Sequence, residues 1–117
     1  LRETYGIDFS EKLTFDAALM YNAVVDRQVD LITAYTSDGR VAAFDLKILE
    51  DTRNALLPYD GILIASSVAA TNNVFMETMQ ALVGQISDEE MREANKIVDV
   101  DRRPISDAVH YLQTVID

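Results

Sequence analysis

Apolar residues recur every three or four positions in several parts of the chain, a spacing that predicts amphipathic helices. The helices are expected over residues 17–28, 68–83, 88–98 and 105–116. Signals at their ends support them. Asp16 suits an N-cap, and Ser87 with Glu90 forms a capping box at the start of the third helix. Gly84 ends the second helix, and Pro104 suits the first position of the last.

Shorter runs of apolar and β-branched residues lie between these helices. They predict strands over residues 11–15, 30–36, 41–49 and 62–65. The run over 30–36 is nearly continuous in apolar residues, as is typical of a strand covered on both faces in a parallel sheet. Because helix and strand patterns alternate in the first half of the chain, the predicted fold class is α/β.

Composition narrows the range of functions. The chain has 117 residues and a net charge of −10, which repels a phosphate backbone and argues against nucleic acid as a partner. It has no cysteine, so disulfides, a thiol nucleophile and cysteine-ligated zinc are excluded. It has one histidine, which excludes a multi-histidine metal site. No apolar run approaches the length of a membrane span.

No motif points to catalysis, a metal or a cofactor. His110 lies on the polar stripe of the last predicted helix, where a solvated surface histidine is expected. Asp99 and Asp101 resemble the start of a calcium loop, but Arg103 and Pro104 stand where that loop needs a ligand and a glycine. The four glycines are scattered and form no phosphate-binding loop. The interpretation is that the protein is not an enzyme.

The tyrosines are more informative. Tyr21 and Tyr111 fall on or beside the apolar faces of their helices, where packing explains them. Tyr35 and Tyr59 lie instead at junctions between predicted strands and loops. Loops at the strand ends line the ligand crevice of open α/β sheets. These two residues are therefore the candidate binding residues, with packing at a strand end as the alternative.

Several segments together resemble a known family, the substrate-binding proteins of osmoprotectant ABC transporters, which bind glycine betaine, carnitine or choline. The resemblance covers nearly the whole chain. Its segments are Leu1 to Phe9, Leu19 to Tyr21, Ala34 to Arg40, Ala43 to Leu46, Leu49 to Asp51, Pro58 to Asp60 and Ile86 to Met91. The tyrosine followed by Asp38-Gly39-Arg40, and the later Pro58-Tyr59, make the combination specific.

The resemblance implies a two-lobed clamshell of the periplasmic-binding-protein type II, of which this chain would be the C-terminal portion. Residues 1–50 would be the later portion of the second lobe. Residues 51–57 would be the hinge return, and residues 58–117 the closing portion of the first lobe. The start of the chain fits an excised piece, because residues 1–5 read as the last turn of a helix with Gly6 as its C-cap.

The resemblance also implies a function. Tyr35 and Tyr59 match two positions of the family's aromatic cage, which holds the quaternary ammonium of glycine betaine, choline or carnitine. The partner would be an ABC transporter permease, and the location extracytoplasmic and membrane-associated, as a lipoprotein or a permease fusion. Unpaired strand edges would favour self-association of the chain. The alternative is a stand-alone α/β protein-interaction or regulatory module that binds no small molecule.

Overall fold

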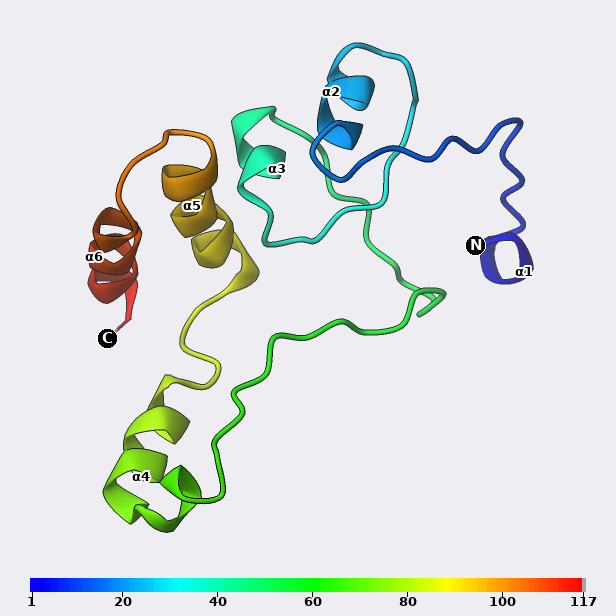
Figure 1. The fold of residues 1–117 in the computed structure, drawn as a ribbon. Helices are drawn as coiled ribbons and strands as arrows, with labels where there is room; N and C mark the ends of the chain where they lie inside the picture. Colours follow the sequence, from blue (N-terminus) through cyan, green and yellow to red (C-terminus); the bar gives the residue numbers. More distant parts are fainter. Residues whose placement is uncertain (117) are drawn as a thin grey trace. The chain divides into compact units, whose positions relative to one another are not determined.

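The computed structural model describes residues 1–116 (Figure 1). Within that range it contains α-helices, one short 3-10 helix and no β-strand. In chain order they are α1 (Arg2–Tyr5), α2 (Met20–Val25), α3 (Gly39–Ala43), η1 (Ala69–Thr71), α4 (Asn73–Leu82), α5 (Asp88–Asp99) and α6 (Ile105–Val115). None of the helices in this range has the length and apolar character needed to cross a lipid bilayer.

The chain forms two compact units. The first contains residues 1–34 and 47–60, and the second contains residues 35–46 with the chain from Gly61 onward. Each unit is therefore built from two separate stretches of sequence.

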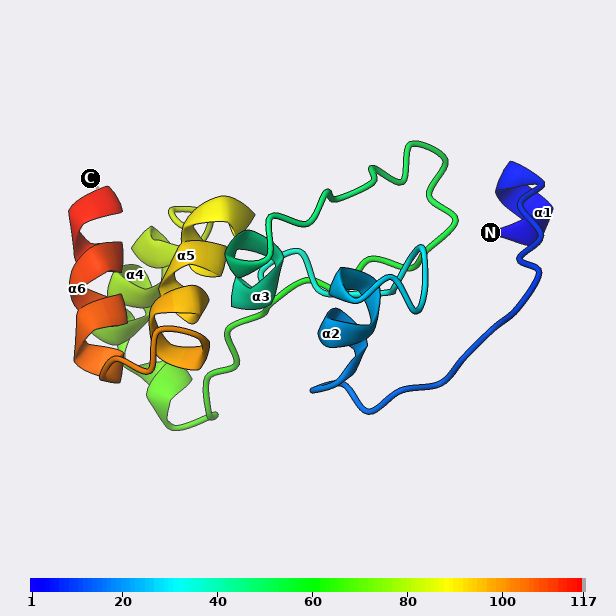
Figure 2. The same ribbon diagram turned by 90° about the horizontal axis from the view of Figure 1, so that it is seen from above.

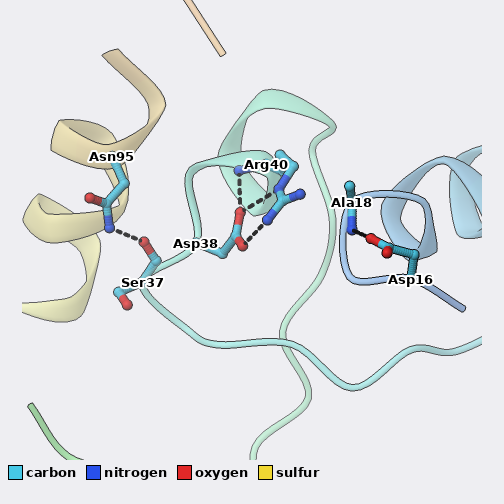
Figure 3. Close-up of polar contacts among 6 residues, drawn as sticks. All are labelled: Asp16, Ala18, Ser37, Asp38, Arg40 and Asn95. Carbon is cyan, nitrogen blue, oxygen red and sulfur yellow. Dashed lines mark hydrogen bonds and ion pairs between the residues drawn. The ribbon is translucent and has the colours of Figure 1, made fainter. Parts of the chain in front are cut away.

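The first unit is organised around α2. The side chain of Asp16 accepts a hydrogen bond from the backbone N–H of Ala18 at 2.9 Å (Figure 3). This bond lies before the helix, whose N-cap is Leu19, so the predicted N-cap at Asp16 is wrong. Regular helix begins only at Met20, so α2 is shorter than the sequence predicts. Tyr21 on this helix is fully buried, which confirms its expected role in packing. Ala23, two positions later, is also buried.

The second unit is organised around α5, which contacts α3 and α6 (Figures 1 and 2). The residues buried within these three helices are small or β-branched. They are Gly39 and Val41 of α3, Ala94 of α5 and Ala108 of α6. Small side chains let helix backbones approach closely. The helix α4 follows η1 and contacts it.

Several of the predicted helix ends are confirmed, although the helix predicted over 68–83 is η1 followed by α4, which begins only at Asn73. The capping box is present: the hydroxyl of Ser87 accepts from the backbone N–H of Glu90, whose carboxylate accepts from the N–H of Ser87. Gly6 has φ 70° and Gly84 has φ 80°, the left-handed conformation that suits glycine after a helix. Pro104 is the N-cap of α6, one position before the first helical residue where the sequence places it.

The four predicted strands are wrong for the described residues. The segment predicted over 41–49 begins as helix instead, because Asp38 caps α3. The other three segments contain no regular strand. A strand is stabilised by a ladder of hydrogen bonds to a neighbouring strand, and within residues 1–116 no such ladder forms. The apolar side chains of Ile62, Leu63 and Ile64 consequently lie exposed. The structure thus shows the helices of the predicted α/β pattern without its sheet.

Candidate functional site

The first candidate residue, Tyr35, begins a tight turn in the second unit. The backbone N–H of Asp38 donates to the carbonyl of Tyr35 at 3.1 Å, which closes a four-residue turn over residues 35–38, here called the Tyr35 loop. The Tyr35 side chain is 58% exposed. A large part of the ring is therefore accessible to a ligand, although the backbone that carries it is fixed.

The Tyr35 loop is held by three side chains from one face of α5. The guanidinium Nε of Arg92 donates to the carbonyl of Thr36 at 2.6 Å. The amide of Asn95 donates to the carbonyl of Ser37 at 2.8 Å (Figure 3). The hydroxyl of Thr36 donates to Oδ2 of Asp88 at 2.5 Å. Residues 88, 92 and 95 are four and three positions apart, so they project from one side of the helix. We call them the α5 anchor.

The Asp38-Gly39-Arg40 motif fixes the other end of the loop. The carboxylate of Asp38 accepts from the backbone N–H and the Nε of Arg40, both at 2.9 Å, and from its terminal nitrogen at 2.7 Å (Figure 3). This arrangement caps α3 and pairs the two charges bidentately. The motif that makes the sequence recognisable therefore acts, in this structure, to hold the backbone after Tyr35.

Glycine is required at position 39 for a separate, steric reason. A Cβ atom at this position would lie 2.3 Å from the backbone nitrogen and 2.5 Å from the Cα of Lys96. Only a residue without a side chain allows α3 to lie this close to α5. The close approach brings the Tyr35 loop within reach of the α5 anchor.

The second candidate residue, Tyr59, lies in the first unit and is 82% exposed. It follows a turn held by the carboxylate of Asp51, which accepts from the backbone N–H of Leu56 at 2.7 Å. The hydroxyl of Tyr5 also donates to Asp51, at 2.5 Å. These bonds, that of Tyr5 foremost, lower the pKa of Asp51 from the ordinary value of 3.8 to about 2.

The turn at Asp51 is joined to α1 by further contacts. The backbone N–H of Arg53 donates to the hydroxyl of Tyr5 at 2.8 Å, and its guanidinium donates to the carbonyl of Thr4 at 2.9 Å. The same guanidinium lies 5.2 Å from the centre of the Tyr5 ring, within range of a cation–π contact. These contacts tie the predicted hinge segment to the first helix.

The two candidate tyrosines belong to different units, and neither unit by itself contains both rings. His110 is exposed on α6, as predicted, and Tyr111 is half-buried. Among residues 1–116 there is no group of three histidine, cysteine, aspartate or glutamate side chains able to hold a metal ion.

Sequence reasoning missed the α5 anchor. The spacing of Asp88, Arg92 and Asn95 places them on one face of the helix, but a polar helix face is ordinarily a solvated one and does not indicate a partner. Their partners, the hydroxyl and carbonyl of Thr36 and the carbonyl of Ser37, lie 52 to 58 positions earlier in the chain and were visible only in the structure.

Comparison with known proteins identifies the family. Residues 1–113 match the family described as the substrate binding domain of ABC-type glycine betaine transport systems. The chain belongs to this family. Its relatives include a carnitine transport binding protein of Listeria monocytogenes, which is 31% identical over 98 residues, covering 83% of this chain and 32% of that protein.

Two other relatives have different named solutes. A glycine-betaine-binding protein of Pseudomonas aeruginosa is 28% identical over 106 residues, covering 88% of this chain and 34% of that protein. An ergothioneine transport permease/ergothioneine binding protein of Helicobacter pylori is 25% identical over 101 residues, covering 86% of this chain and 18% of that protein. The chain thus spans about a third, or less, of the length of these relatives.

Proposed function

We propose that this chain supplies part of a binding site for a quaternary ammonium solute such as glycine betaine, choline or carnitine, and that Tyr35 and Tyr59 are part of an aromatic cage. The observation that carries the proposal is the exposed ring of Tyr35 on a turn whose backbone is held at both ends. Family membership supports it. The solutes in the relatives' names, carnitine, glycine betaine and ergothioneine, all carry a trimethylammonium group.

The chemistry of the ligand explains the use of tyrosine. A trimethylammonium group has no N–H to donate and carries a positive charge at every pH. The negative face of an aromatic ring attracts such a cation, by about 0.5–2 kcal/mol for each ring and more as water is excluded. Several rings are therefore needed, and a site that closes around the ligand gains most from each of them.

The proposed site belongs to a two-lobed α/β protein of the type II periplasmic-binding class. Residues 1–50 would lie in the second lobe, residues 51–57 would return through the hinge, and residues 58–117 would complete the first lobe. Ligand binding would then be coupled to lobe closure. The exposed apolar residues of the predicted strands, Ile62 to Ile64 among them, would form part of a sheet whose two faces are covered in the complete protein.

The proposed role is delivery of the bound solute to an ABC transporter permease, without catalysis. The protein would act outside the cytoplasm and at the membrane, as a lipoprotein or as a domain fused to its permease. Family membership supports this role, because the family is defined by the substrate-binding domain of such a transport system.

The test is calorimetric titration of the complete encoded protein with choline and with its neutral analogue 3,3-dimethyl-1-butanol, in which carbon replaces nitrogen. Choline should bind at least about tenfold more tightly, because the two ligands share shape and apolar area and differ in charge. Glycine betaine and carnitine titrated in the same way rank the natural candidates. Equal affinity for choline and the neutral alcohol would overturn the cage.

Variants connect the result to the residues. Tyr35→Ala and Tyr59→Ala should each weaken choline binding by at least about tenfold, whereas the Phe variants keep the ring face and should lose less. Tyr111→Ala is the matched control, since this half-buried tyrosine of α6 lies outside the proposed cage. An effect of Tyr111→Ala as large as that of Tyr35→Ala would count against the assignment.

A further inference from the structure

We infer that Asp88, Arg92 and Asn95, the α5 anchor, are positioning residues that fix the orientation of the Tyr35 ring toward the ligand. The inference rests on the proposed function of Tyr35. It goes further by assigning a role in ligand affinity to three residues of a helix that itself supplies no ring to the cage.

The geometry shows why these three residues act on Tyr35. Two of them bind the backbone carbonyls of the two residues that follow Tyr35, at 2.6 and 2.8 Å, and the third binds the hydroxyl of Thr36 at 2.5 Å. Each successive residue after Tyr35 is thus held, because Asp38 in turn caps α3. The turn therefore cannot rotate about its own backbone without breaking at least one of these bonds.

A fixed backbone matters because of the side chain that it carries. Tyr35 is 58% exposed, so packing alone restricts its ring only in part. A cation–π contact depends on the ring face being turned toward the cation. Fixing the turn before the ligand arrives lowers the conformational entropy lost on binding, which is the general advantage of a preorganised site.

The charges of the anchor also suit this role. Arg92 donates through a guanidinium, and hydrogen bonds from a charged group are stronger than neutral ones. Asp88 lies in the first turn of α5, where a negative charge is favoured by the helix dipole. From this position the carboxylate accepts the hydrogen bond of the Thr36 hydroxyl.

The decisive experiment is a double-mutant cycle on choline binding in the complete encoded protein. Arg92→Ala should weaken choline binding by about 5- to 10-fold while leaving the folded state intact by circular dichroism. In a Tyr35→Ala background, the same Arg92→Ala change should have no further effect, because the anchor acts through the ring. Arg92→Lys keeps a cationic donor and should recover part of the affinity.

Arg103→Ala is the matched control. It removes the same charge from the same unit, where Arg103 pairs with Asp107 rather than with the Tyr35 loop. It should leave choline affinity unchanged within about twofold. A second measurement is the ratio of the affinities for choline and 3,3-dimethyl-1-butanol. Arg92→Ala should reduce this ratio, because a misoriented Tyr35 ring loses the cation–π contact but keeps its apolar contact with either ligand.

The outcomes separate the two proposals. If Tyr35→Ala leaves choline binding unchanged, the proposed function of Tyr35 fails. If Tyr35→Ala weakens binding and Arg92→Ala does not, the aromatic cage is supported and the positioning role of the α5 anchor is refuted. Additive losses in the double variant would also overturn the anchor, because they would show that Arg92 acts independently of Tyr35.

Discussion

Replacing Gly39 by alanine is the sharpest test of how α3 is placed against α5. The added Cβ would lie 2.3 and 2.5 Å from backbone atoms of Lys96 and 2.8 Å from the carbonyl carbon of Asn95. Ordinary contacts of a Cβ atom are at 3.4–4 Å, so the two helices would have to separate by about 1 Å. The obstructing atoms are helix backbone, which cannot move aside as a flexible side chain would.

The expected loss of stability follows from two sources. Overpacking of this kind costs about 1–3 kcal/mol. Separation would also lengthen the hydrogen bonds from Arg92 and Asn95 to the Tyr35 loop, which are worth about 1 kcal/mol each. Gly39→Ala should therefore lower the free energy of unfolding by about 3–5 kcal/mol.

Urea denaturation of the complete encoded protein, followed by circular dichroism, measures this change. Gly61→Ala is the matched control, because nothing lies within 4 Å of the added Cβ and the backbone conformation is ordinary; its effect should stay within about 0.5 kcal/mol. Gly84→Ala should fall between them, at about 1 kcal/mol, because φ 80° strains a residue with a side chain in otherwise open space. Equal unfolding free energies for the Gly39 and Gly61 variants would refute the close approach of α3 to α5.

Three further predictions concern local contacts. The hydrogen bonds that lower the pKa of Asp51 to about 2 should stabilise the fold fully above the ordinary pKa of 3.8, and this stabilisation should be lost as the pH falls toward 2. Tyr5→Phe removes the foremost of these bonds and should raise the pKa of Asp51, which NMR titration of its carboxyl carbon would measure. Ser87→Ala removes the capping box and should destabilise by about 1 kcal/mol in thermal unfolding, whereas Ser106→Ala, an exposed control, should not. Self-association of the isolated chain stays a prediction; exposed apolar residues 62–64 favour it, and a concentration-independent monomer in sedimentation would refute it.

Features that depend on neighbours within one helical turn could be read from the sequence. The capping box at Ser87 and Glu90, the left-handed Gly6 and Gly84, and the buried face of Tyr21 all follow from residues a few positions apart. The exposed His110 followed in the same way. Local hydrogen bonds and periodic apolar faces are encoded in short segments, which is why these predictions held.

The strand predictions were wrong because a strand is stabilised by hydrogen bonds to another segment of chain, not by residues close to it in the sequence. The run over 62–65 has the composition of a buried strand, but its composition does not show whether a neighbouring strand is present to hydrogen-bond with its backbone. Without such a neighbour in the described residues, the segment has exposed side chains and no ladder. The segment predicted over 41–49 failed for another reason, since the cap at Asp38 starts a helix there.

The sequence by itself determined the family resemblance, several helix ends and the choice of Tyr35 and Tyr59 as candidate binding residues. Only the tertiary structure decided what holds Tyr35 in place. Thr36 and Ser37 bind side chains of α5 that lie 52 to 58 positions later, and Gly39 permits the approach that brings them together. Such contacts depend on which surfaces meet when the chain folds. The spacing of residues along the chain does not reveal these contacts, because the segment between residues 37 and 88 could adopt many conformations.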